Sequence, residues 1–185
     1  MSTTVYKYND KVLVNSANDK WLKKPEVVDY VTIGTQTWKT TNLAVPMGTL
    51  NTDYFIRDGK YYYSLTSPAI ISYITSNYPG WHIPTKNEFI TLRGTVGNSA
   101  SALAAAGFSI DETAGAYYYE DSWNYLSDSY QYLMGTGYEE FGEYYYPYLK
   151  TSISTLSVSI WSAGDWEGHL TDSLAMPIRL IQDSN

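Results

Sequence analysis

Apolar and polar residues alternate over short stretches in the first part of the chain, which is the pattern of half-buried β-strands. β-prone residues flank the turn signal Asn9-Asp10, so we expect a hairpin over residues 5–14. The alternation over residues 31–38 predicts a second hairpin, with its turn at Gly34-Thr35. The chain therefore begins with hairpins rather than helices.

A third hairpin is predicted around the Asp58-Gly59 pair. Residues 54–56 and 61–63 lie on either side of it and are aromatic or β-branched. Asp and Gly both accept a positive φ, which a tight two-residue hairpin turn requires at its central positions. The two aromatic stretches are therefore expected to pair as antiparallel strands.

The middle of the chain changes to helical spacing. Apolar residues within 68–76 fall on one face of a helix. Thr85 and Glu88 have the spacing of a capping box, which predicts the start of a second helix. The alanine-rich residues 99–106 predict a third helix, which Gly107 ends.

The rest of the chain is β-prone and completes the predicted architecture. Residues 157–161 and 176–181 are expected to form closing strands. Helices in the middle with strands at both ends predict an α+β domain and not a parallel α/β one. Pro25 predicts a boundary between an N-terminal β-ribbon or attachment segment, residues 1–25, and the main domain, residues 26–185.

The charge distribution narrows the range of partners. The chain has a formal net charge of −7, and no Lys or Arg lies between Arg93 and Lys150. Binding to a phosphate backbone or to anionic lipids requires several Lys or Arg side chains on the protein surface. Because this chain is acidic, we expect no nucleic-acid partner. No segment has the ~20 consecutive apolar residues of a membrane span, so we expect no membrane insertion.

The composition also bears on cofactors and export. The chain has no cysteine, which excludes disulfides and thiolate metal sites. Its first residues lack the apolar core of a secretory signal peptide. The acidic residues from Asp121 to Asp128 offer oxygen ligands without a known calcium-loop spacing. We expect no metal and no other cofactor, with a structural calcium ion as the alternative.

Four pieces of sequence stand in the order of a known family. They are Ile-Gly-Thr-Gln-Thr-Trp at 33–38, Gly-Trp-His-Ile-Pro-Thr at 80–85, Ile-Trp-Ser at 160–162 and Ile-Arg-Leu-Ile at 178–181. This series resembles the Fibrobacter succinogenes major paralogous domain, a family common in Bacteroidetes. The resemblance covers about residues 31–183.

The resemblance implies a C-type-lectin-like fold, with two or three helices beside small antiparallel sheets and with long loops. It also implies an adhesive or display role at a surface. Thr41, Phe89 and Ala163 stand where the family has Glu, Trp and Ser, and the family's cysteines are missing. We interpret the chain as a divergent member with a retained core. Folds of this kind also occur in receptor-binding proteins of phage tails. The expected location is therefore a virion, as part of a phage tail, or a cell surface.

The tyrosines are the strongest functional signal. Eleven of the twenty lie between residues 117 and 148. Binding loops favour Tyr because it offers a large contact area at low entropic cost, whereas a buried Tyr must find a partner for its hydroxyl. About half are expected to line strands and the others to form an exposed aromatic loop surface. The candidate ligand-binding residues are Tyr144, Tyr145, Tyr146 and Tyr148, with Trp166, Glu167 and His169 from a glycine-flanked loop.

No catalytic residue is predicted. Nucleophile elbows, phosphate-binding glycine loops and zinc-binding His-Glu-x-x-His motifs are all missing from the sequence. Of the two histidines, His82 lies inside the family motif and is interpreted as a packed structural residue.

Together these patterns favour a non-catalytic binding or adhesion module for a cell-surface glycan or protein receptor. Self-association into a homo-oligomer through the N-terminal ribbon is also expected. Two alternatives remain open. One is a glycan-active hydrolase that uses acidic residues such as Glu139, Glu140 and Glu143, and the other is a structural assembly subunit.

Overall fold

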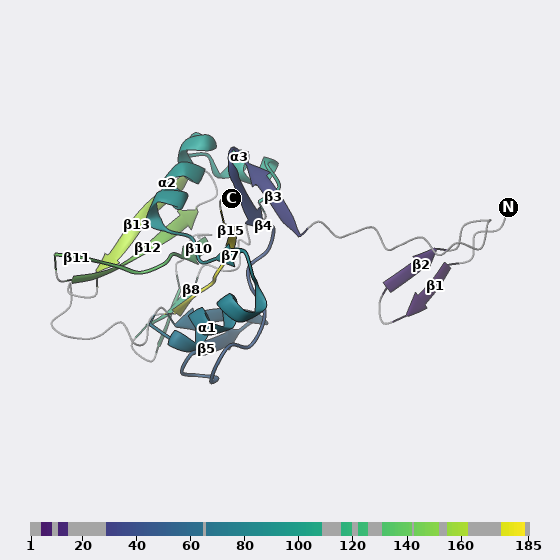
Figure 1. The fold of residues 1–185 in the computed structure, drawn as a ribbon, viewed down its shortest axis with the longest axis horizontal. Coiled ribbons are helices and arrows are strands. Elements are labelled where there is room, and N and C mark those ends of the chain that lie inside the picture. Colours follow the sequence, from purple (N-terminus) through teal and green to yellow (C-terminus); the bar gives the residue numbers. More distant parts are fainter. Residues whose placement is uncertain are drawn as a thin grey trace.

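A computed structural model describes most of the backbone of the main domain and a separate N-terminal hairpin (Figure 1). The described backbone covers residues 5–8, 11–14, 29–64, 66–108, 116–119, 122–125, 131–141, 143–151, 155–162 and 175–183. Side chains are described for residues 29–64, 66–108, 133–141, 144–151, 155–159 and 175–183.

The predicted N-terminal hairpin is confirmed. β1 (Val5–Tyr8) pairs antiparallel with β2 (Lys11–Val14) in a two-stranded sheet, drawn at the right of Figure 1. Residues 15–28, which contain the predicted domain boundary at Pro25, lie outside the described residues, so the boundary stays a prediction.

Two antiparallel sheets are each built around one of the other predicted hairpins. The turn between β5 and β6 has positive φ at Asp58 (49°) and Gly59 (73°), as that Asp-Gly pair predicts. The strands of one sheet, in order, are β3 (Tyr30–Ile33), β4 (Gln36–Lys39), β15 (Ile181–Gln182) and β7 (Trp81–His82). Those of the other are β5 (Tyr54–Arg57), β6 (Lys60–Ser64), β14 (Ala175–Met176), β8 (Ala116–Tyr119) and β9 (Ser122–Tyr125).

The third antiparallel sheet is organised around its longest strand, β12 (Glu143–Thr151), which pairs along one side with β13 (Leu156–Ser162). β10 (Gln131–Met134) and β11 (Tyr138–Glu140) follow each other along its other side. β10 ends opposite Tyr148 and β11 begins opposite Tyr145, so residues 135–137 face residues 146–147. Three residues opposite two make a β-bulge.

The three predicted helices are α1 (Pro68–Asn77), α2 (Lys86–Thr95) and α3 (Ala100–Ala105). At the start of α2 the Glu88 N–H donates to Thr85 Oγ1, and the Thr85 N–H donates to the Glu88 carboxylate, so both halves of the capping box form. Ser99 caps α3 in a similar way through the N–H of Ala102. Gly97 and Gly107 follow α2 and α3 with positive φ, which ends each helix.

The core consists of two large apolar clusters. One gathers Ile70 and Ile74 of α1 with residues of the five-stranded sheet and the segment before β15. The other surrounds Phe89 of α2 and joins residues of the third sheet to Trp38 of β4, which stacks on Phe89 at 6.0 Å between ring centroids. Burying a side chain such as Phe89 stabilises the fold by about 1.5–3 kcal/mol, so this contact fixes α2 on the sheet of β3 and β4.

The expected closing strand over residues 176–181 is wrong as a continuous strand. Its N-terminal part, β14, belongs to the five-stranded sheet, and its C-terminal part, β15, belongs to the sheet of β3 and β4. Pro177 lacks an N–H and cannot continue a ladder. The carbonyls of Pro177, Ile178 and Leu180 instead accept hydrogen bonds from other segments, at 2.8–3.0 Å. The segment therefore crosses between two sheets.

The architecture is α+β, as expected: a few helices beside small antiparallel sheets. Among the described residues no helix has the length and the apolar character that crossing a bilayer would require.

Candidate functional site

The β-bulge between β10 and β11 is hydrogen-bonded to the loop that precedes α2. Thr136 is the extra residue of the bulge. Its N–H donates to the Pro84 carbonyl at 2.7 Å, and its hydroxyl donates to the Ile83 carbonyl at 2.6 Å. Gly135 keeps the ladder bond to Pro147, at 2.8 Å. Bulges bend a strand and redirect its side chains. This one joins the third sheet to the N-terminal end of α2.

Two glycines allow the bulge to pack this closely. A Cβ on Gly135 would lie 2.8 Å from Pro147 Cγ and 2.9 Å from a ring carbon of Phe89. A Cβ on Gly137 would lie 2.6 Å from Tyr146 Cε1. All three distances are well inside van der Waals contact, so close packing requires glycine at both positions.

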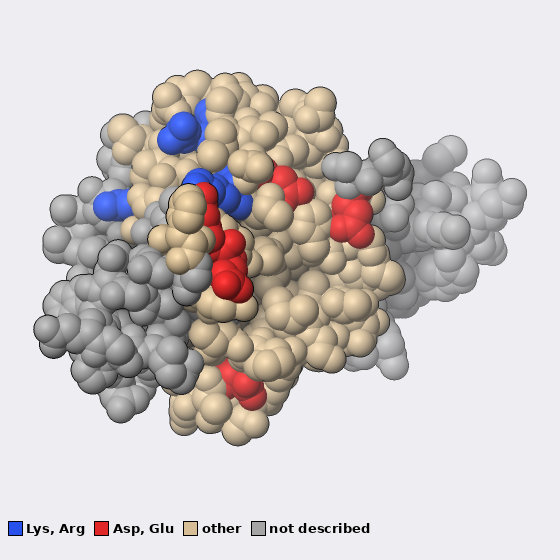
Figure 2. Space-filling model, turned by 60° about the vertical axis from the view of Figure 1, so that its left-hand side comes forward, with Lys and Arg blue, Asp and Glu red and all other residues tan. Residues whose placement is uncertain are grey.

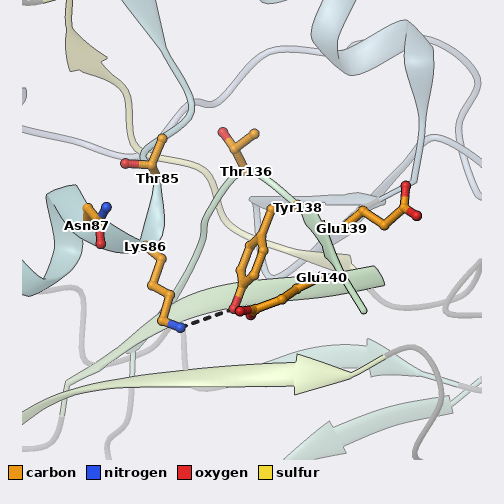
Figure 3. Close-up of a pocket in the computed structure, with 8 residues that line it drawn as sticks. Thr85, Lys86, Asn87, Thr136, Tyr138, Glu139 and Glu140 are labelled. Carbon is orange, nitrogen blue, oxygen red and sulfur yellow. Dashed lines mark hydrogen bonds between the residues drawn. The ribbon is translucent and has the colours of Figure 1, made fainter. Parts of the chain in front are cut away.

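A groove of about 480 Å³ lies between this bulge and α2 (Figure 3). One wall comes from the first residues of α2 and the other from the bulge and β11. Its lining residues are Thr85, Lys86, Asn87, Thr136, Gly137, Tyr138, Glu139 and Glu140.

Lys86 and Tyr138 connect the two walls of the groove. Lys86 Nζ donates to the Tyr138 hydroxyl at 3.1 Å (Figure 3) and lies 5.3 Å from the ring centroid. The Tyr138 ring stacks on Tyr145 of β12, with 5.5 Å between centroids and 24° between planes. The stack and the hydrogen bond hold the Tyr138 ring in place beside the groove.

The carboxylates of Glu139 and Glu140 lie on opposite sides of β11, as strand alternation requires. In Figure 3 the Glu140 side chain extends toward the side of Tyr138 and Lys86, and that of Glu139 points away. Both residues are exposed. On the face drawn in Figure 2, charged side chains are few, and a row of acidic ones lies directly beside basic ones.

The four candidate tyrosines after Glu143 all lie on β12, so their expected placement in a loop is wrong. Tyr144 is 54% exposed, whereas Tyr145 is half-buried in its stack with Tyr138. Tyr146 covers Gly137, and Tyr148 packs against the α1 core cluster. Tyr is well suited to half-buried strand positions, which is why composition alone misplaced these four residues.

Phe141 belongs to the candidate surface and was missed by the sequence reasoning. It lies between β11 and β12 and is 95% exposed, with φ of +56°. Only part of a hairpin signal was present: Gly142 precedes the β-prone residues 144–146, but the residues before Phe141 are Tyr-Glu-Glu, and Glu is depleted in strands.

Three further candidates, Trp166, Glu167 and His169, lie outside the described residues. The side chains of residues 121–128, the alternative calcium site, also lie outside them. Within the described part of the chain no group of three or more His, Asp or Glu side chains is arranged to hold a metal ion.

His82 is held between two carboxylates. Its Nδ1 lies 2.6 Å from Asp183 Oδ1, and its Nε2 lies 3.0 Å from Glu88 Oε1. The hydrogen bond with Glu88 raises the pKa of His82 above its ordinary value of 6.5, against the opposing effect of burial. Burial alone would raise the pKa of Glu88, but its hydrogen bonds with His82 and Thr85 outweigh that and lower it below 4.5. His82 therefore links the capping box of α2 to the C-terminal strand.

A polar hollow of about 540 Å³ lies beside this cluster. It is lined by Thr35, Gln36, Thr37, Glu88, Thr91, Ile181, Gln182 and Asp183. Gln36 donates from Nε2 to the Glu88 carbonyl at 3.0 Å, so β4 is also joined to α2 here. Hydroxyl, amide and carboxylate groups make up most of the walls, and the His82 cluster borders solvent on this side.

Comparison of the chain with protein-family models, with curated proteins and with solved structures found no match in any of the three.

Proposed function

We propose that this protein is a non-catalytic binding or adhesion module that presents an aromatic surface to a glycan or protein receptor. The β11–β12 aromatic surface consists of Phe141 at the hairpin tip, Tyr138 and Tyr145 on one face of the strands, and Tyr144 on the opposite face, as strand alternation requires. The observation that carries the proposal is the exposure of Phe141 (95%) at the tip of a hairpin that holds a fixed tyrosine ring, Tyr138, on one face and the exposed Tyr144 (54%) on the other.

The chemistry of this surface suits recognition. Tyr combines a large apolar face with a polar hydroxyl and has few side-chain torsions to immobilise on binding. The Tyr138 ring is already held by Lys86 and Tyr145, so less ordering entropy is lost when a ligand packs beside it. Carboxylates and hydroxyls along the groove are acceptors and donors for sugar hydroxyls or for peptide groups.

We also propose a C-type-lectin-like fold of the major paralogous family. Several residues of the resembling pieces have structural roles that support a retained core. Gly34 makes the β3–β4 turn with φ of +62°, and Trp38 is fully buried. Gln36 bonds to the backbone of α2, and Thr85 caps that helix. A surface location, on a phage tail or on a cell, goes with this proposal.

The hydrolase alternative is less favoured by the groove. Glycoside hydrolysis needs two carboxyl groups ~5–9.5 Å apart that flank one bond. Glu139 and Glu140 both line the groove, but they are adjacent on a strand and extend to opposite sides of it. This pair is therefore poorly arranged for the reaction.

The test compares the wild-type chain with a Tyr144→Ala/Tyr145→Ala variant. Fluorescently labelled protein is applied to a glycan array and to a panel of intact bacterial cells. We expect attachment to fall at least about tenfold, as for hot-spot aromatics. Tm should fall moderately, because Tyr145 is half-buried in its stack with Tyr138, but the variant should stay folded at the assay temperature.

Tyr30→Ala is the matched control, because Tyr30 is 47% exposed but lies on β3 in a different sheet. Its attachment should equal that of the wild type. Undiminished attachment of the double variant would remove Tyr144 and Tyr145 from the proposed surface, and failure of the wild type to attach to any surface would contradict the proposal.

A further inference from the structure

Phe141 combines two unfavourable features. Among the described residues it is the most exposed large apolar side chain, at 95%, and the next is Tyr144 at 54%. Its φ of +56° lies in the left-handed region, where a bulky side chain is a genuine outlier. Neither hydrophobic burial nor local backbone preference accounts for phenylalanine at this position. Such outliers are typical of functional positions.

The chain itself supplies a comparison. The β5–β6 hairpin has the same two-residue spacing, and its first loop residue, Asp58, has φ of +49°. There the chain uses Asp-Gly, the favoured pair for such a turn, whereas the β11–β12 hairpin has Phe141-Gly142. The fold therefore needs no aromatic residue at the tip of a hairpin like this one.

The groups around Phe141 are acidic. Glu139 and Glu140 precede it and are exposed, and Glu143 follows two positions later in the sequence. Among the described residues, the groove beside the tip is lined by the carboxylates of Glu139 and Glu140 and by one cation, Lys86, so negative charge is in excess there. A partner surface that meets this tip is therefore favoured when it is cationic. An anionic bilayer is disfavoured for the same reason.

We propose that Phe141 is an anchor residue that inserts into an apolar pocket, rimmed by basic side chains, on a protein receptor. This inference rests on the proposed binding function and deepens it. Anchors of protein interfaces are aromatic side chains that enter desolvated pockets, surrounded by a polar rim. A sugar stacks on an aromatic face that its neighbours hold in place, as Tyr138 is held, whereas Phe141 projects from the hairpin tip with its whole ring accessible.

The first experiment tests insertion without the natural receptor. β-Cyclodextrin provides an apolar cavity of a size that accepts a benzyl group, and its rim can carry amino, hydroxyl or carboxymethyl groups. The Phe141 ring signals are followed by NMR during titration with each form. We expect them to shift, with affinity falling from the amino to the hydroxyl to the carboxymethyl form and with added salt reducing the differences. No shift of these signals, or a preference for the carboxymethyl form, would overturn the inference.

The second experiment uses Phe141→Asn, because Asn-Gly is the favoured pair for this turn and the variant should fold at least as stably as the wild type. We expect a higher Tm together with attachment to cells weakened by at least about tenfold. Phe141→Leu should bind with intermediate strength, since it keeps an apolar side chain. Proteinase K treatment of the cells should abolish wild-type attachment, and periodate oxidation should leave it unchanged.

The outcomes separate this inference from the proposed function. Wild-type attachment that Phe141→Asn retains, or that periodate rather than proteinase K abolishes, refutes the protein-receptor anchor and leaves the binding module standing. If Phe141→Asn loses attachment while the Tyr144→Ala/Tyr145→Ala variant keeps it, the anchor is supported and the two tyrosines are removed from the site. A wild-type chain that attaches to no cell contradicts the proposed function, and the cyclodextrin titration then decides on insertion alone.

Discussion

The ring of Tyr146 lies so close to Gly137 that a Cβ on the glycine would come within 2.6 Å of Tyr146 Cε1. This contact joins β12 to the bulge that forms one wall of the groove. The half-buried Tyr146 is thus part of the framework of the groove and not of its contact surface. Its residue type alone would suit either role.

Substitution Gly137→Ala is expected to destabilise the fold by about 1–3 kcal/mol, because the added methyl group overpacks this contact. The free energy of unfolding, measured by urea denaturation, checks this. Gly94→Ala is the control: Gly94 lies within α2, and nothing lies within 4 Å of an added Cβ. There alanine should stabilise the helix by about 0.5–1 kcal/mol. Equal tolerance of both substitutions would mean that the Gly137 contact is easily relieved.

The His82 cluster predicts a pH-dependent contribution to stability. Because the pKa of His82 is raised above 6.5 by its bond with Glu88, its contribution is fully present below 6.5 and is lost as pH rises through the folded-state value. Because the pKa of Glu88 is lowered below 4.5, its contribution is present above 4.5 and is lost as pH falls through the folded-state value. Both contributions are complete between 4.5 and 6.5.

Unfolding free energies of His82→Gln over a pH series test this linkage. The variant should lose stability in that window and should show a flatter decline on the alkaline side than the wild type. Glu88→Gln should flatten the acid side, although it also removes the carboxylate of the capping box. An unchanged alkaline slope in His82→Gln would argue against the linkage.

The hydrogen bond between Arg179 and Asn42 predicts a large effect of substitution on stability at a position outside the groove. Arg179 is only 1% exposed, its Nε donates to Asn42 Oδ1 at 2.9 Å, and its guanidinium lies 4.0 Å from the centre of the Phe108 ring. Asn42→Ala removes the acceptor of a buried cation and should cost about 1.5–3 kcal/mol. Asn42→Asp keeps an acceptor oxygen and should cost less. Thermal unfolding followed by circular dichroism compares them, and equal Tm values for wild type and Asn42→Ala would refute the expectation.

The N-terminal ribbon predicts self-association. β1 and β2 form a two-stranded sheet with no third strand among the described residues, and such a hairpin alone is marginally stable in water. We therefore expect deletion of residues 1–25 to reduce the number of subunits per particle, with the main domain still folded. Light scattering after size-exclusion chromatography gives this number as the measured mass divided by the mass of one chain. An identical number of subunits with and without the ribbon would contradict this.

The sequence alone determined the features whose interactions are local. Asp58-Gly59 specifies its turn because both residues accept positive φ, and Thr85 with Glu88 specifies a helix start because the two partners are three residues apart. The same holds for the apolar face of α1, where Ile70 and Ile74 are buried as their spacing predicts. The α+β class follows from the order of such elements.

Only the tertiary structure decided which segments meet. The candidate tyrosines lie on β12 and not in a loop, residues 176–181 divide between two sheets, and the Thr136 bulge faces the start of α2. The partners of the last two contacts are far apart in the chain, and the tyrosines of β12 suit a strand and a loop equally well. Pairing between strands that no short turn connects depends on packing against distant segments, so local spacing carries little information about it. For that reason the sequence predicted an aromatic binding surface without placing it, and the surface that we propose, at the β11–β12 hairpin with Phe141 at its tip, depends on the tertiary structure.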